Sequence, residues 1–259
     1  MAGDTKAMVV IGAGAGIGGH AAARFAAGGY HAVLCRRSDQ AGLDRLVGQI
    51  RDAGGEASGC LLNASEDGSI EAMLEEVERE IGPVEVVLYN LGAQIGDRSL
   101  ADTTHKTFEL GWRLATFGLF RVAKALAPGM VARGSGTLLV TSATAAMRGN
   151  SGQHSHAAAM GGRRLLCQTL NAELAPKGVH VAHVVVDGAV NSPDTLGKMI
   201  GDRWEEFIAA KGEDGIIDPA ALADVYWNLA HQPKNCWTHE VDVRPHSDRA
   251  WFNGAGLTL

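Results

Sequence analysis

The 259-residue sequence lacks several features that would place it in other protein classes. It has no run of basic residues, and its net charge of -6 argues against nucleic acid or an anionic membrane surface as its main partner. No apolar run approaches the roughly 20 residues of a membrane helix, and residues 1–10 lack a signal-peptide pattern. The cysteines have no metal-binding or redox spacing; they are Cys35, Cys60, Cys167 and Cys236. We therefore expect a cytoplasmic protein with reduced thiols and no metal site.

The composition is that of a chain with a full hydrophobic core. Hydrophobic residues make up 46% of the sequence and charged residues 20%, which excludes a disordered chain. Cys35 and Cys60 lie in apolar runs and are therefore expected to be buried, unreactive thiols.

The glycine-rich stretch from Val9 to Gly18, which reads VVIGAGAGIG, is the strongest local signal. An apolar strand pattern precedes it and an alanine-rich helical pattern follows it. Glycines allow a tight turn and let a pyrophosphate approach the main chain, while the following helix offers free N–H groups and its positive dipole end. In this context the motif predicts a dinucleotide site, formed by Gly12, Gly14, Gly16, Ile17 and Gly18. The alternative is a glycine-rich loop that serves packing alone.

Short apolar runs alternate with helical patterns along the rest of the chain. The predicted strands are 7–11, 31–35, 57–62, 84–89, 136–141, 179–186 and 237–243. They are continuous apolar runs rather than alternations, which is typical of parallel strands covered on both faces. The clearest predicted helices are 66–81 with Ser65 as N-cap, 104–133 and 153–175. We expect an α/β fold with a single doubly wound (Rossmann-type) parallel sheet of about seven strands, in one domain over residues 1–259.

The segment 191–217 breaks this alternation. It follows a predicted strand, is rich in glycine, and carries a short amphipathic piece around Trp204 and Phe207. In open α/β sheets ligands bind beyond the carboxyl ends of the strands. The segment is therefore either a lid over a substrate pocket or an ordinary long surface loop.

Taken together, these patterns resemble the short-chain dehydrogenase/reductase family over nearly the whole chain. Gly12-x-x-x-Gly16-x-Gly18 matches the glycine motif of the family, and Asn90-Leu91-Gly92-Ala93 resembles its Asn-Asn-Ala-Gly turn. The run 136–142 resembles the strand that leads to the catalytic serine. Asp187-Gly188 stands where the family has Pro-Gly, and Ser192 where it often has a threonine that contacts the nicotinamide. The resemblance implies that Asn90, Gly92, Gly188 and Ser192 bind the cofactor.

The residues after the second predicted strand favour NADP(H) over NAD(H). An acidic residue at this point would bind a ribose 2′-hydroxyl, whereas arginine binds a 2′-phosphate through two parallel hydrogen bonds. Here the chain has Arg36 and Arg37. Asn63 stands where the family usually has an aspartate near the adenine. The alternative is that both arginines are solvated surface residues.

The catalytic residues of the family are missing. The family uses a tyrosine as proton donor, a lysine four residues later, a serine and an asparagine. Counting from the motifs places His156, Met160, Ala143 and Ala115 at these positions, and no Tyr-x-x-x-Lys occurs anywhere in the chain. The segments 214–227 and 237–245 look similar to a poorly characterised branch of the family that lacks the tyrosine but keeps the lysine. This sequence departs even from that branch.

Histidine can donate or accept a proton at physiological pH, so His156 is the candidate replacement for the tyrosine. His154, two residues earlier, and Ser142, beside the serine position, are further catalytic candidates. The alternative is that both histidines are polar residues at a helix start without a chemical role. Met160 carries no charge and indicates a more apolar pocket than the family norm.

Three functional hypotheses remain open from the sequence. The first is an NADP(H)-dependent oxidoreductase that acts on a small carbonyl or imine compound, with His156 as proton donor. The second is an isomerase, lyase or dehydratase on the same scaffold, and the third is a catalytically inactive NADP(H)-binding protein. The resemblance also implies a homo-oligomer, a dimer or a tetramer, in which Trp237 and Trp251 would suit an interface.

Overall fold

The seven strands in the described part of the chain join in one parallel sheet. The computed structural model describes residues 5–92 and 98–252, and the strand order is β3-β2-β1-β4-β5-β6-β7. Each neighbouring pair is parallel. The strands are β1 (Ala7–Ile11), β2 (His31–Arg36), β3 (Glu56–Leu61), β4 (Val84–Tyr89), β5 (Thr137–Ala143), β6 (His180–Val186) and β7 (Glu240–Val243). The predicted fold class is confirmed, and the strand bounds agree with prediction to within two residues, except that β7 begins three residues later than predicted.

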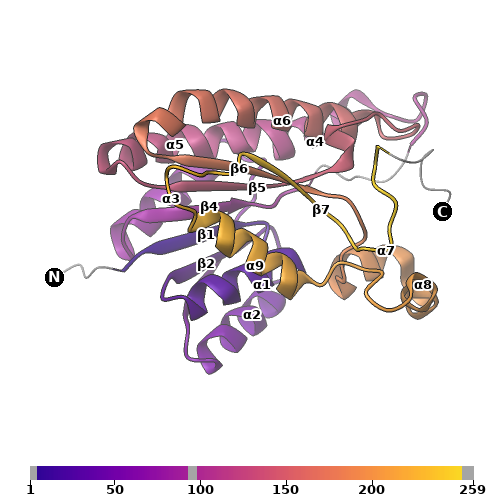
Figure 1. Cartoon of the computed structure of the whole chain (residues 1–259), viewed down its shortest axis with the longest axis horizontal. Coiled ribbons are helices and arrows are strands. Elements are labelled where there is room, and N and C mark those ends of the chain that lie inside the picture. The colour runs from indigo at the N-terminus through magenta and orange to yellow at the C-terminus, as the bar shows by residue number, and fades with distance from the viewer. Residues whose placement is uncertain (1–4, 93–97, 253–259) are drawn as a thin grey trace.

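Helices cover both faces of this sheet (Figure 1). Buried residues of α1, α2 and α9 pack on one face, and those of α3, α5 and α6 on the other. The helices are α1 (Ile17–Ala27), α2 (Gln40–Asp52), α3 (Ser69–Glu80), α4 (His105–Trp112), α5 (Gly118–Arg133), α6 (His154–Leu174), α7 (Lys198–Ile200), α8 (Trp204–Lys211) and α9 (Pro219–Ala230).

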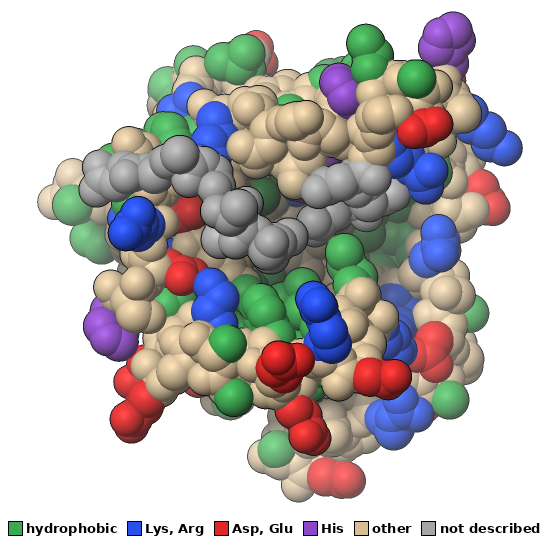
Figure 2. Space-filling view, turned by 90° about the vertical axis from the view of Figure 1, so that its right-hand side faces the viewer, with side chains coloured by type: hydrophobic (Ala, Val, Ile, Leu, Met, Phe, Trp, Pro, Cys, Tyr) green, Lys and Arg blue, Asp and Glu red, His purple; other side chains and the backbone are tan. Residues whose placement is uncertain are grey.

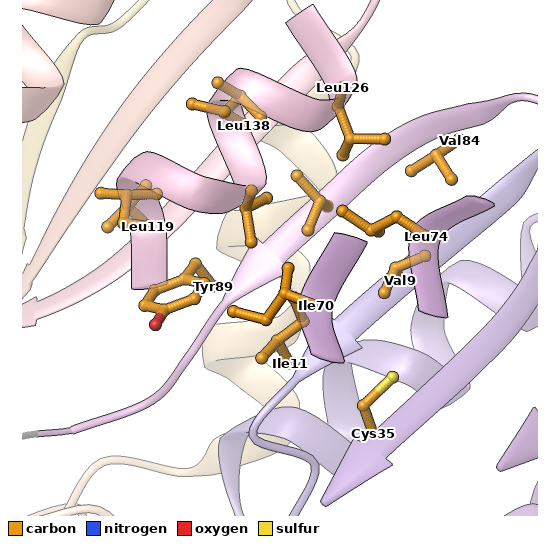
Figure 3. Close-up of a cluster of buried hydrophobic side chains, with 14 of the residues drawn as sticks. Val9, Ile11, Cys35, Ile70, Leu74, Val84, Tyr89, Leu119, Leu126 and Leu138 are labelled. Carbon is orange, nitrogen blue, oxygen red and sulfur yellow. The ribbon is translucent and has the colours of Figure 1, made fainter. Parts of the chain in front are cut away.

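The continuous apolar strands explain this three-layer arrangement. Successive side chains of a strand point to opposite faces, so Val9 and Ile11 join the core under α3 while Met8 and Val10 join the other core. Figure 3 shows the first of these clusters, in which Cys35 lies on the same side as Val9 and Ile11. Because both faces are buried, a parallel strand needs no polar alternation.

Two predicted helices differ from expectation, one in where it begins and the other in its internal geometry. Ser65 is not the N-cap of α3, because the helix begins at Ser69 and Gly68 caps it with φ +79°. The predicted helix 104–133 is continuous but contains a π-helical turn, Arg113–Phe117. Such turns often mark functional sites inside helices. This one carries Ala115, which the sequence predicts to stand at the family's asparagine position.

The segment His105–Arg133 also corrects one expectation from composition. Among the described residues, this helical stretch is long and apolar enough to cross a membrane, with a mean hydropathy of 1.3 over its best window. Half of that window is buried inside the fold. Core helices of globular domains meet the same two criteria, so length and composition alone do not assign a membrane role.

The strand order places a topological switch point between β1 and β4. The chain winds outward from β1 to β3 on one side and then from β4 to β7 on the other. In such sheets the ligand crevice lies beyond the carboxyl ends of the strands at this point. Figure 2 shows this face, where hydrophobic side chains lie in a hollow and Lys and Arg side chains lie around it.

The segment 191–217 forms short helices beyond the carboxyl ends of the strands (Figure 1). A bridge between Val190 and Ile217 closes the base of the segment. The Lys211 ammonium pairs with the Asp248 carboxylate at 3.0 Å, which ties α8 to the C-terminal tail. This placement suits a lid, which stays a prediction.

Candidate functional site

The turn between β1 and α1 can only be built from glycine at two positions. Gly12 has φ +101°, and an ideal Cβ there would lie 3.0 Å from the backbone of Asn90. A Cβ on Gly18 would lie 2.7 Å from the Gly12 carbonyl oxygen. Asn90 completes the turn, because its side-chain amide donates to the Gly12 carbonyl at 3.0 Å. The ends of β1 and β4 are therefore held tightly together at the switch point.

Beside this packed turn the chain leaves open space. An ideal Cβ on Gly14 would meet no atom within 4 Å, so packing does not require glycine at this position. The helix α1 starts at Ile17, and its N-cap Gly16 provides no side-chain hydrogen bond to the first turn. The Gly19 N–H is bonded to the Gly14 carbonyl at 2.8 Å. The start of a helix without a side-chain cap, with the positive end of its dipole, is an arrangement that can bind phosphate.

Ser192 lies against the same turn, although it is 174 positions further along than Gly18. An ideal Cβ on Gly16 would lie 2.7 Å from the Ser192 hydroxyl oxygen. Ser192 is buried, and its hydroxyl hydrogen-bonds that of Thr195 at the start of the lid segment. The fold thus places Ser192, the residue predicted to contact the nicotinamide, directly against the predicted glycine turn.

Arg36 is the last residue of β2 and Arg37 follows it, at the rim of this space. Arg37 is exposed, whereas Arg36 lies across the first turn of α2 and pairs with the Asp39 carboxylate at 3.2 Å. Asp39 caps α2 by accepting the Gly42 N–H at 2.9 Å. That hydrogen bond, aided by the nearby Arg36 charge, holds the pKa of the Asp39 carboxyl below its ordinary value. A 2′-phosphate placed here would share Arg36 with Asp39.

The remaining predicted cofactor residues lie in turns at the carboxyl ends of their strands. Asn63 follows β3, and its side-chain oxygen accepts hydrogen bonds from the Ser65 N–H and hydroxyl. Gly92 is exposed and adjoins residues 93–97, which lie outside the described part of the chain. Gly188 follows β6, where an ideal Cβ would lie 2.7 Å from Pro245 Cδ. Glycine at 188 is thus required by the tail that crosses it.

The predicted catalytic residues lie at the ends of α6 and β5. His154 and His156 are half-buried in the first turn of α6. The buried hydroxyl of Ser142 lies 3.9 Å from the sulfur of Met160 and is thus turned toward α6. Met160 belongs to a small apolar cluster with Ala115. The two residues that the sequence predicts to replace the family's asparagine and lysine therefore lie in one buried apolar cluster.

Sequence reasoning missed Arg163, which is only 1% exposed. Its guanidinium donates to the carbonyl oxygens of Ala115 at 2.9 Å, Thr141 at 2.5 Å and Leu91. It also lies over the Tyr89 ring, 5.2 Å from the ring centre. Burial lowers the pKa of this guanidinium. Arg163 therefore ties the π-helical turn to the ends of β4 and β5, directly behind the candidate site.

The C-terminal tail also takes part in this site. The Asp187 carboxylate, at the end of β6, accepts the Trp251 N–H at 2.9 Å and pairs with Arg244 at 3.2 Å. Arg148, in the loop that leads to His154, donates to the Trp251 carbonyl at 3.0 Å. The aspartate in place of the family proline was visible in the sequence, but its tail partners were not. These bonds join the tail to the loop before α6.

A surface cavity of about 460 Å³ opens beside the start of α6. Its lining comes from two loops and consists of Arg98, Ser99, Leu100, Ser151, Gly152 and His154. The Arg98 N–H donates to the Gly152 carbonyl at 2.9 Å, which holds the two loops together. Within residues 5–92 and 98–252, no group of three His, Cys, Asp or Glu side chains is arranged to hold a metal ion.

Comparison with known proteins gives concordant matches. Residues 6–197 match the family model described as short chain dehydrogenase. The short-chain reductase protein NovJ of Streptomyces niveus is 32% identical over 242 residues, which cover 92% of this chain and 87% of that protein. A crystal structure of a short-chain dehydrogenase from Rhodopseudomonas palustris is 33% identical, with a TM-score of 0.77 and coverage of 93% of this chain and 99% of that one. A variant of actinorhodin polyketide ketoreductase, crystallised with NADPH, is 26% identical with a TM-score of 0.82 and coverage of 93% and 97%.

Proposed function

Because the chain belongs to the short-chain dehydrogenase/reductase family, whose members among its relatives are oxidoreductases, we propose that it is an NADP(H)-dependent reductase of a small carbonyl or imine compound. The observation that carries the proposal is the open space at Gly14, between the carboxyl end of β1 and the uncapped start of α1. A pyrophosphate fits this space chemically, because backbone N–H groups and a helix dipole favour anions there.

Different residues of the chain have different roles in the proposed reaction. When bound, NADPH supplies the hydride that reduces the carbon of the carbonyl or imine. His156 donates a proton to the oxygen or nitrogen of the substrate. The guanidinium of Arg163 binds the carbonyls of Thr141 and Leu91, and so it fixes the ends of β4 and β5 beside the proposed site. The cavity beside His154 would take the substrate, with Arg98 available for an anionic group.

The reaction is tested by incubating the full chain with NADPH and a panel of small ketones, aldehydes and imines. We expect the nicotinamide absorbance to fall with at least one class of substrate. The test variant is Gly14→Val. Its side chain would enter the proposed phosphate space, and no protein atom lies within 4 Å of its Cβ. We expect this variant to melt like the parent chain and to lose turnover. Turnover of a panel compound without net loss of NADPH would instead support an isomerase, lyase or dehydratase.

One observation favours a second candidate, an NADP(H)-binding protein without redox turnover. Ala115 and Met160 occupy two of the family's catalytic positions, and they pack together in a dry cluster. An alanine and a thioether cannot relay a proton as an asparagine and a lysine do. Tight NADPH binding without turnover of any panel compound would support this candidate.

Cofactor preference gives a separate prediction. We expect NADPH to bind at least about 10-fold more tightly than NADH, because each charge-assisted hydrogen bond to the 2′-phosphate contributes about 1.5–3 kcal/mol. Replacing Arg36 and Arg37 by alanine is expected to weaken NADPH binding by at least about 10-fold and to leave NADH binding nearly unchanged. Calorimetric titration of both nucleotides measures the ratio.

The control for general charge is Arg45→Ala, which removes an exposed arginine from α2. We expect it to change the affinities for NADPH and NADH by less than about 2-fold, since an exposed charge is screened by salt. Equal affinity of the parent chain for both nucleotides, or tighter binding of NADH, would refute the preference.

A further inference from the structure

Two cysteines that are 25 residues apart in the sequence lie side by side in the sheet. Cys35 of β2 and Cys60 of β3 are direct partners in the parallel ladder. Their sulfur atoms are 3.4 Å apart, which is within hydrogen-bond distance for two thiols. The sequence led us to expect two separate, unreactive buried thiols. The register of β2 and β3 instead makes them a dithiol.

The spacing expected for two paired strand residues falls within the range that a disulfide can join. Neighbouring strands lie about 4.8 Å apart, and disulfides join residues whose Cα atoms are about 4.4–6.8 Å apart. An S–S bond of about 2.05 Å requires the two sulfurs to approach from 3.4 Å, without separating the strands.

The two thiols differ in exposure and in acidity. Cys35 is fully buried, with its sulfur 3.8 Å from that of Met73 under α3, whereas Cys60 is half-buried on the edge strand. The hydrogen bond between them lowers the pKa of the Cys60 thiol, while that bond and burial raise the pKa of Cys35. An oxidant that arrives from solvent therefore meets Cys60 first, and in its more reactive form.

We propose that Cys60 and Cys35 are a peroxide-oxidisable dithiol that forms an intramolecular disulfide beneath the nucleotide site. In the first step the Cys60 sulfur attacks hydrogen peroxide, the O–O bond breaks, and Cys60 becomes a sulfenic acid as water leaves. In the second step the Cys35 sulfur attacks the Cys60 sulfur, the S–O bond breaks, and a second water leaves with the Cys35 proton. Two thiols are oxidised by two electrons, and one peroxide is reduced to two waters. A dithiol reductant reverses the change.

The disulfide is coupled to the cofactor through the main chain. The Cys35 carbonyl accepts hydrogen bonds from the N–H groups of Gly12 and Ala13, both at 2.9 Å. Arg36 is the next residue, so strain that the S–S bond places on the Cys35 backbone would reach both the turn and the arginine, even though the strands stay paired. We expect oxidation to weaken NADPH binding by about 3- to 10-fold, an effect of about 1 kcal/mol. This coupling rests on the proposed function, whereas the disulfide itself does not.

The chemical step is tested on the full chain with hydrogen peroxide and intact-mass spectrometry. We expect the loss of two hydrogens, a linked peptide pair that contains Cys35 and Cys60, and recovery with dithiothreitol. In Cys35→Ser we expect Cys60 to gain one oxygen that a sulfenic acid reagent traps, and Cys60→Ser should prevent both products. Cys236→Ser, which removes an exposed lone thiol, is the control and should still lose two hydrogens. Linkage through Cys236 or an unmodified dithiol would overturn the proposal.

The coupling is tested by titrating NADPH into the reduced and the oxidised chain. A 3- to 10-fold weaker affinity in the oxidised parent chain, absent in Cys60→Ser, supports the coupling. Equal affinity in both states refutes it. If the reduced chain does not bind NADPH, the proposed function fails, while the mass measurement still decides whether the disulfide forms.

Discussion

Replacing His156 by alanine is expected to lower the turnover of NADPH-dependent reduction by about 100-fold or more, because a positioned general acid contributes roughly 10²–10⁴-fold. His156 lies in the first turn of α6, and counting from the sequence motifs predicts that it stands at the family's tyrosine position. Nothing in the proposal gives it a cofactor-binding role. The affinity for NADPH should therefore stay within about 3-fold of the parent value. Steady-state kinetics and calorimetry on the same preparation separate the two quantities.

Two further variants sharpen this test. His154→Ala removes the neighbouring imidazole, which lines the cavity, and should change KM more than kcat. His156→Tyr restores the donor of the family, but Met160 cannot lower the phenol pKa as a lysine does. We expect that variant to be less active than the parent chain. Full turnover in His156→Ala would remove His156 from the mechanism and favour another proton donor.

The fold was predictable because its signals are local. The central strands are mostly apolar runs, and each run is short enough to be delimited by the next helical pattern. The glycine turn was equally visible. A side chain on Gly18 would meet the Gly12 carbonyl, which is close in the chain, and one on Gly12 would meet the backbone of Asn90, which follows the neighbouring strand β4. The Ser65 cap was wrong because Asn63 draws Ser65 into a turn and Gly68 starts the helix instead.

The candidate site was only partly predictable because its support comes from long-range pairs. Cys35 and Cys60 meet through strand register, and Asp187 meets Arg244 and Trp251 through the path of the tail. No spacing rule in one sequence encodes these partners. The family pattern placed His156 and Met160 but gave no reason to consider Arg163, because its position has no polar role in that pattern.

Arg163→Met is expected to lower the free energy of unfolding by about 3 kcal/mol or more. The substitution leaves the carbonyls of Ala115, Thr141 and Leu91 without their guanidinium donor, and each unsatisfied buried acceptor costs about 1–3 kcal/mol. The contact with the Tyr89 ring is lost as well. For a domain of this size the melting temperature should fall by roughly 6–12 °C. Chemical denaturation and thermal melting measure the two quantities.

The sign of this effect depends on which cost dominates. Burying a guanidinium is itself unfavourable, and replacing complete buried ion pairs by apolar residues can stabilise a protein. Here the partners are main-chain carbonyls that no side-chain substitution removes, so their desolvation remains after the charge has gone. Arg163→Lys, which offers one ammonium group to three carbonyls, should lie between methionine and the parent.

The adjacent Arg164→Gln breaks a partly exposed ion pair with Glu240 and should cost only about 0–1 kcal/mol. If Arg163→Met is as stable as Arg164→Gln, the three carbonyls find other donors and Arg163 does not fix the site. If it is destabilised as expected but folded, NADPH binding should weaken too, because Leu91 adjoins Gly92 and Thr141 adjoins Ser142. A buried guanidinium that is bound by three main-chain carbonyls and packed on the Tyr89 ring would then be the element that keeps this site in place.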